Sequence, residues 1–143
     1  MKKILFLMMI NMCVFATAYA DFTRNATTGI VTDSRTGLMW QDDAVSSTMT
    51  WSAAITYCED KVLGGYSDWR LPNQRELLSI ADRSRYNPAT NSVFVNTASD
   101  GYWSSTANVG STGYAWGVSF DGGYTYANIK NNDYYARCVR SGQ

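Results

Sequence analysis

The chain has 143 residues, with 12 Lys and Arg against 12 Asp and Glu, and it contains no histidine. This balanced charge gives no bulk attraction to nucleic acid or to an anionic membrane. The lack of histidine removes Ser-His-Asp and Cys-His catalysis, histidine-ligated zinc and an imidazole base at neutral pH.

The first twenty residues have the pattern of a secretory signal peptide. Lys2 and Lys3 form a basic start, residues 4–15 form an apolar run, and two alanines around a tyrosine make a cleavage site that ends at Ala20. The run is shorter than the roughly 20 residues that a membrane span needs. We predict an exported protein, whether periplasmic, cell-surface or extracellular, whose mature chain 21–143 is a single domain without a membrane span.

Two cysteines, Cys58 and Cys138, remain after removal of the signal peptide. An even number in an oxidising compartment indicates one disulfide bond, and the alternative is a pair of free thiols. A bond between them closes a loop of about 80 residues, which contributes on the order of 4 kcal/mol in the chain-entropy model.

The N-terminal half predicts a hairpin followed by two helices. The predicted strand residues are 22–25, 29–33 and 38–41, with a turn at 34–37 and a polar loop at 42–49. Thr50 can cap a helix from Trp51 to about Val62, whose apolar residues, Cys58 among them, share one face, and two glycines end it. A second helix begins after Pro72, where Asn73 and Glu76 have the spacing of a capping box.

The C-terminal half predicts a long loop and then a small antiparallel sheet. Residues 84–100 show no sustained periodicity, and Phe94 is the expected anchor of that loop. Alternating residues predict a strand over 114–120, a hairpin turn and a return strand over 124–129. A last strand is expected over 134–140. This order of elements predicts an α+β fold.

Four short motifs occur in a fixed order, which is difficult to obtain by chance. They are Thr36-Gly37-Leu38-Met39-Trp40, Gly64-Gly65-Tyr66-Ser67-Asp68-Trp69-Arg70-Leu71-Pro72, Tyr102-Trp103-Ser104-Ser105-Thr106 and Ala136-Arg137-Cys138-Val139-Arg140. Together they resemble the Lcl C-terminal domain family of collagen-like bacterial adhesins, a branch of the C-type-lectin-like fold. The resemblance covers roughly Gly29 to Arg140. It implies two helices packed on small antiparallel sheets, with a disulfide from the first helix to the final strand, where Cys58 and Cys138 occur.

Most motif residues are interpreted as structural. Trp69 and Trp103 are expected to be buried, and Arg70, which is near Asp68 and Glu76, is expected to fix a loop through charge-assisted hydrogen bonds. Arg137 could pair with an inner carboxylate such as that of Asp33. The structural set is Trp40, Asp68, Trp69, Arg70, Pro72, Glu76, Trp103 and Arg137.

The sequence does not support catalysis or a cofactor. The long loop contains Tyr86-Asn87-Pro88-Ala89, which is not the acidic or amide tripeptide of calcium-dependent sugar binders. Asp121 and the Asn131-Asn132-Asp133 cluster offer oxygen ligands for calcium, but turn formation explains them more simply. Oxidases of the same fold need a reactive cysteine pair, whereas these two cysteines are interpreted as structural. We predict no metal site, no cofactor and no enzymatic activity.

The C-terminal surface is the predicted binding site. Tyrosine and asparagine are concentrated there, and tyrosine gives a large contact area at low entropic cost. The candidate ligand-binding residues are Trp116, Tyr124, Tyr126, Asn128, Lys130, Asn131, Asn132 and Tyr134. The alternative is that these tyrosines only cover the edge of a sheet.

The expected function is that of an adhesin-like module which recognises a surface glycan or a surface protein. The resemblance implies sulfated polysaccharides as ligands and a possible homotrimer. Lys130, however, is the only basic residue between Gly101 and Asn132, which weakens that ligand. Two alternatives remain open: a periplasmic structural or assembly partner, and a variable lectin-like protein diversified by a retroelement.

Overall fold

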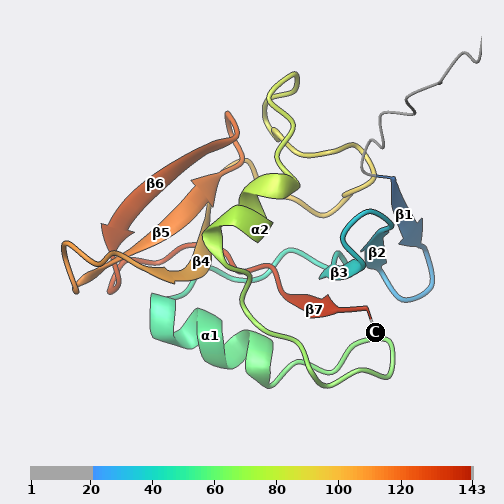
Figure 1. The fold of residues 1–143 in the computed structure, drawn as a ribbon, viewed down its shortest axis with the longest axis horizontal. Helices are drawn as coiled ribbons and strands as arrows, with labels where there is room; N and C mark the ends of the chain where they lie inside the picture. The colour runs from blue at the N-terminus through green and yellow to red at the C-terminus, as the bar shows by residue number, and fades with distance from the viewer. Residues whose placement is uncertain (1–20, 143) are drawn as a thin grey trace, which may run out of the picture.

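Residues 21–142, the part of the chain that this computed structural model describes, contain two small antiparallel sheets and two helices joined by long loops (Figure 1). The predicted signal peptide, 1–20, lies outside the described residues. The elements are β1 (Phe22–Asn25), β2 (Ile30–Asp33), β3 (Leu38–Gln41), α1 (Trp51–Glu59), α2 (Gln74–Ser79), β4 (Gly101–Ala107), β5 (Tyr114–Ser119), β6 (Tyr124–Ile129) and β7 (Val139–Ser141). The predicted α+β class is confirmed. Across residues 21–142, neither helix has the length and apolar character needed to span a bilayer.

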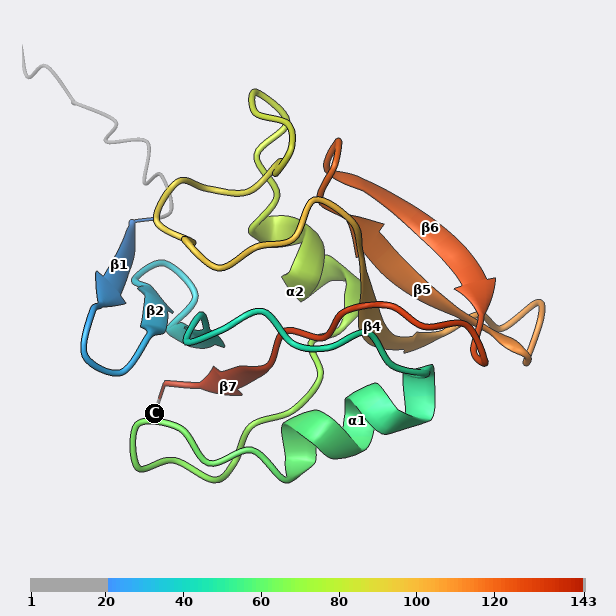
Figure 2. The ribbon, with the colours of Figure 1, turned by 180° about the vertical axis from the view of Figure 1, so that it is seen from behind.

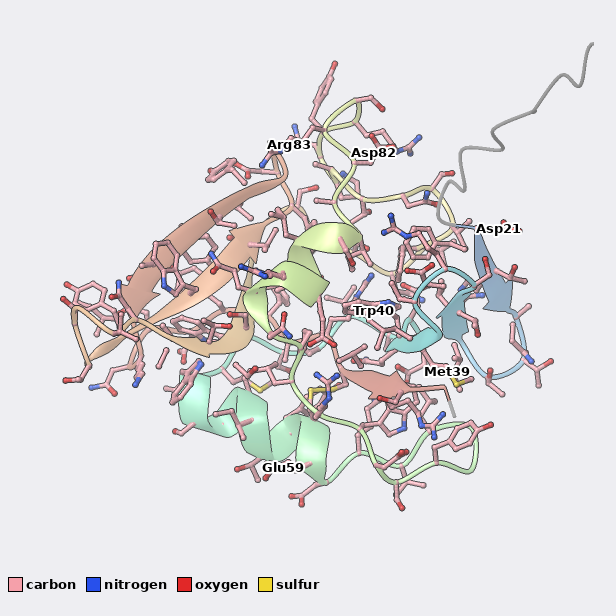
Figure 3. All side chains as sticks on the ribbon, viewed as in Figure 1. Asp21, Met39, Trp40, Glu59, Asp82 and Arg83 are labelled. Carbon is pink, nitrogen blue, oxygen red and sulfur yellow. A yellow bond between two sulfur atoms is a disulfide. The ribbon has the colours of Figure 1, made fainter. Side chains whose placement is uncertain are left out.

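The first sheet has the strand order β1-β2-β3-β7, so it joins the beginning and the end of the described chain. Its two faces differ because neighbouring residues of a strand point to opposite sides. Val31 and Trp40 are paired across β2 and β3 and are fully buried. Thr32 and Met39 are the next pair and lie on the other face. Figure 3 shows Trp40 directed into the centre of the molecule and Met39 directed away from it.

The second sheet has the order β4-β5-β6 and lies at the opposite end of the molecule (Figures 1 and 2). Helix α2 packs against β4 and β5, and α1 packs against β4. Trp103 of β4 is fully buried, and its indole Nε1 donates to the carbonyl oxygen of Met49 at 2.9 Å. The buried half of this sheet therefore fixes the position of the strands that carry the predicted binding residues.

One disulfide joins Cys58 of α1 to Cys138, the residue before β7, with the two Cα atoms 5.3 Å apart. Both cysteines are fully buried. The bond lies beside α1 in Figure 3. The predicted disulfide is thus confirmed.

Helix α1 is shorter than predicted, because it ends at Glu59 and not near Val62. Val62 is 72% exposed, so it does not belong to the buried face. After the helix, the backbone of Leu63 pairs with that of Tyr66 in a tight turn. Leu63, and not Val62, packs against the core, because the turn redirects the chain before another helical turn can form.

The predicted last strand, 134–140, is wrong over most of its length. Only Val139–Ser141 joins the first sheet. Before it, Tyr134 bridges to Met49 and Tyr135 bridges to Tyr102, so the extended chain changes its partner at each step. No strand was predicted at the position of β4. Its first four residues are all buried, so they show no alternation of apolar and polar side chains.

Helix α2 begins with the predicted capping box. The Asn73 side chain accepts from the backbone N–H of Glu76 at 2.8 Å, and the Glu76 carboxylate accepts from the backbone N–H of Asn73 at 2.9 Å. Arg70 adds two hydrogen bonds to the same carboxylate, at 2.9 and 2.7 Å. Glu76 therefore joins the motif that contains Trp69 to the start of the helix.

Replacement of this carboxylate should reduce stability in a pH-dependent way. Burial raises the pKa of Glu76, but the hydrogen bonds from Arg70 and from the Asn73 backbone outweigh it, so the pKa lies below 4.5. We expect Glu76→Ala to lose about 1 kcal/mol of unfolding free energy at neutral pH, as other cap removals do. The charge-dependent part should be present above pH 4.5 and be lost as pH falls through the lower folded pKa. Urea titrations of wild type, Glu76→Ala and Glu76→Gln from neutral to acidic pH would measure both effects. A difference between wild type and Glu76→Gln that is the same at every pH would contradict the charge-dependent part.

Candidate functional site

The structure brings four of the eight predicted binding residues into one cleft. Tyr124, Tyr126 and Asn128 project from one face of β6, and Tyr134 follows the next turn. The cleft has a volume of about 350 Å³. Its lining is completed by residues of β4, β5, β6 and the turns beside them, namely Asp100, Gly101, Ser119, Asp121 and Ala127.

Hydrogen bonds hold Asn128 in the lining of this cleft, which we call the C-terminal cleft. Its side-chain Nδ2 donates to the Tyr134 hydroxyl. Its Oδ1 accepts from Asn132 Nδ2 at 2.9 Å and from the backbone N–H of Ile129 at 2.8 Å. The Tyr134 ring in turn meets the buried ring of Trp103 edge-on, with centroids 5.0 Å apart. The wall of the cleft is therefore connected to the core and is preorganised.

Tyr126 lies against backbone, and two glycines make this possible. Its ring covers Gly101 and Gly117, where an added Cβ would overlap the phenol group. Within the described part of the chain, its buried hydroxyl has no hydrogen-bond partner. Burial raises the pKa of Tyr126, so this hydroxyl stays protonated at neutral pH.

Two carboxylates line the cleft, and neither was predicted from the sequence to lie there. Asp121 accepts hydrogen bonds from the hydroxyls of Ser119 and Tyr124, and the Ser119 bond lowers the pKa of Asp121. Asp100 is exposed and accepts from the backbone N–H of Gly101 at 2.7 Å. Among the described residues, none of the side chains that line the cleft is basic. The only sequence signal for this arrangement is that both aspartates occur at strand ends.

The other four predicted binding residues lie elsewhere. Trp116 pairs with Ala127 and is therefore on the face of the sheet opposite to Tyr126, which pairs with Gly117. The Lys130 ammonium lies 4.2 Å from the centre of the Trp51 ring and donates to the carbonyl oxygen of Thr112. Asn132 supports Asn128 from outside the lining, and Asn131 is exposed.

The predicted structural residues are mostly placed as expected. Trp40, Trp69 and Trp103 are buried, and Arg70 pairs with Glu76. The carbonyl oxygen of Pro72 accepts from the backbone N–H of Ser105 at 2.8 Å. Asp68, however, pairs with Arg140 and not with Arg70, at 2.6 Å.

The suggested pairing of Arg137 with Asp33 is wrong, because Arg137 pairs with Asp42 at 3.3 Å. The Asp33 carboxylate is already occupied by its own turn, where it accepts from the backbone N–H of Arg35 and from the Thr36 hydroxyl. Asp42 is fully buried and also binds Arg24 at 2.8 Å. This cluster was not predicted, because residues 42–49 have only the pattern of a polar loop.

Within residues 21–142, no three or more Cys, Asp or Glu side chains are grouped so that they could hold a metal ion. A family model, that of the Lcl C-terminal domain, matches residues 29–140 of the chain. The match contains all four motifs, the disulfide and the residues of the C-terminal cleft. No curated protein matches the chain.

Proposed function

Because the chain belongs to the Lcl C-terminal domain family, we propose that it is an exported, non-enzymatic, adhesin-like module that recognises a surface glycan through its C-terminal cleft. Family membership suggests a surface-associated module. The proposal includes a C-type-lectin-like fold, which is supported by the two sheets and by the disulfide from α1 to the end of the chain.

The observation that carries the proposal is the convergence of Tyr124, Tyr126, Asn128 and Tyr134 on one concave surface. Small-ligand sites are typically concave, and a volume of about 350 Å³ falls within their usual range. Tyrosine supplies an apolar ring together with a hydroxyl, so it can contact both the C–H face and the hydroxyls of a sugar.

The charge of the cleft favours an uncharged glycan over a sulfated one. Asp100 and Asp121 line it, and sulfate groups placed beside them would be repelled. Lys130, the predicted contact for an anion, is instead stacked on Trp51. We expect little retention on heparin at low or moderate salt; strong retention would favour the sulfated ligand that the family resemblance implies.

A glycan array on the folded, disulfide-bonded protein, with and without calcium, tests the proposal. We expect Tyr124→Ala to weaken binding at least about fivefold, since loss of an aromatic hot-spot contact costs more than about 1 kcal/mol. Tyr124 is 50% exposed, so this change should leave the fold intact.

Tyr114→Ala is the matched control for this test. Tyr114 is 38% exposed, belongs to the neighbouring strand β5 and lies outside the cleft. It should bind as the wild type does. Equal losses in the two variants, or no glycan bound by the wild type, would contradict the proposed function.

A further inference from the structure

A second concave surface lies at the other end of the molecule, on the outer face of β1, β2 and β3. We call it the N-terminal trough. Its volume is about 560 Å³, larger than that of the C-terminal cleft. None of the predicted binding residues lines it. Figures 1 and 2 show that the loop after α1 passes beside this sheet, far from β6.

The floor of the trough is one face of the sheet. Thr23 is paired with Thr32, and Thr32 with Met39, so these three side chains share a face. The wall is the turn between Leu63 and Tyr66. Gly64 touches the Ile30 side chain so closely that a Cβ would overlap it, and its φ of +63° also favours glycine. The turn is therefore packed on the sheet, and the trough exists before any ligand binds.

The floor presents hydrogen-bonding groups without partners. Within the described part of the chain, the hydroxyls of Thr23, Thr32 and Ser34 make no hydrogen bond, although all three line the trough. The Asn25 Oδ1 atom accepts from two backbone N–H groups of its own turn, which leaves the amide NH₂ as a donor. Hydroxyls both donate and accept, so this set complements the ring hydroxyls of a sugar.

An aromatic ring stands beside these groups. Tyr66 is 39% exposed and lines the trough. Its ring is stacked on the Arg140 guanidinium, whose carbon lies 3.8 Å from the ring centre, and Asp68 binds the same guanidinium at 2.6 and 3.1 Å. The ring is thereby held in place and offers a rigid apolar surface.

The charged residues that line the trough indicate whether it suits a charged or an uncharged sugar. Arg24 is the charged residue among those that line the trough, and its Nε and one terminal nitrogen already bind the carboxylate and the carbonyl oxygen of Asp42. No carboxylate lines the trough within the described residues. An aminated ligand would therefore find no opposite charge, and the one guanidinium that a sulfated ligand could approach is mostly buried and already paired with Asp42. The other polar groups of the lining are hydroxyls, an amide and an aromatic ring, which are uncharged and suit a neutral sugar.

We infer that the N-terminal trough is a second saccharide-binding site, selective for a neutral sugar unit and independent of the C-terminal cleft. Two sites at opposite ends would let one molecule contact two glycan chains, or one long chain twice. A polysaccharide bound at both sites would be held more tightly than at either site alone.

Heteronuclear NMR titration with maltotriose, cellotriose and triacetylchitotriose at millimolar concentration tests this inference. We expect at least one of them to shift the amide signals of Thr23, Thr32 and Tyr66. Thr32→Val keeps the side-chain shape and removes only the hydroxyl, and it should weaken that binding about three- to tenfold, as the loss of a neutral hydrogen bond does. Thr125→Val, on β6 and outside both surfaces, is the matched control and should have no effect.

Three outcomes would overturn the inference: no shift of these signals by any of the three sugars, a stronger shift with a sulfated trisaccharide, or wild-type binding by Thr32→Val. The two proposals fail separately. Tyr124→Ala should leave the trough signals responsive, and Thr32→Val should leave binding at the C-terminal cleft unchanged. A loss at one surface therefore does not count against the other.

Discussion

Replacement of both Cys58 and Cys138 by alanine is expected to lower the free energy of unfolding by at least 4 kcal/mol. The bond spans 80 residues, and a crosslink of that length removes about 4 kcal/mol of denatured-state entropy in the chain-entropy model. Both residues are fully buried beside Trp69 and Trp103, so the lost sulfur atoms add a packing cost. For a domain of this size, the total is a large share of its stability.

Reduced wild-type protein is the control that separates these two contributions, because its thiols still fill the space while the crosslink is absent. Guanidinium titration should show a lower midpoint in the reduced protein and a further decrease in the double alanine variant. The dependence of the unfolding free energy on denaturant should steepen in both, since the denatured chain expands without the bond. An unchanged midpoint after complete reduction would show that the bond is not a main source of stability.

Local patterns in the sequence predicted the parts of the fold that have a repeated signal. The β6 strand was predicted with its observed bounds, because its residues alternate between two faces and a glycine turn precedes it. The capping box at Asn73 and Glu76 was visible from spacing alone. Cysteine number and the helical position of Cys58 were sufficient to indicate the disulfide.

Contacts between distant segments could not be predicted in the same way. Asp100 and Asp121 meet at the C-terminal cleft only because β4 pairs with β5, and nothing near either residue encodes that pairing. The trough on the outer face of the first sheet was also not predicted. The residues that line it include threonines of two strands and a tyrosine from a turn more than thirty residues further along the chain.

Asp42 shows how these distant segments depend on one another. Its buried carboxylate accepts from Arg24 at 2.8 Å, from Arg137 at 3.3 Å and from the backbone N–H groups of Val95 and Asn96 at 3.0 and 3.1 Å. Burial lowers the pKa of Arg137, whereas Tyr102 and Asp42 act in the opposite direction. One carboxylate thus fixes the long loop, the segment before β7 and a residue that lines the N-terminal trough.

Asp42→Ala should therefore destabilise the protein by about 3–5 kcal/mol, because removal of one partner leaves a buried charge without compensation. The matched control is the neighbouring variant Asp43→Ala. Asp43 forms a partly exposed pair with Lys61 at 3.3 Å, and loss of such a pair costs at most about 1 kcal/mol. Because the long loop ends at Asp100, Asp42→Ala should also weaken binding at the C-terminal cleft, which Asp43→Ala should not. Equal unfolding midpoints for the two variants would show that the buried cluster does not hold these segments together.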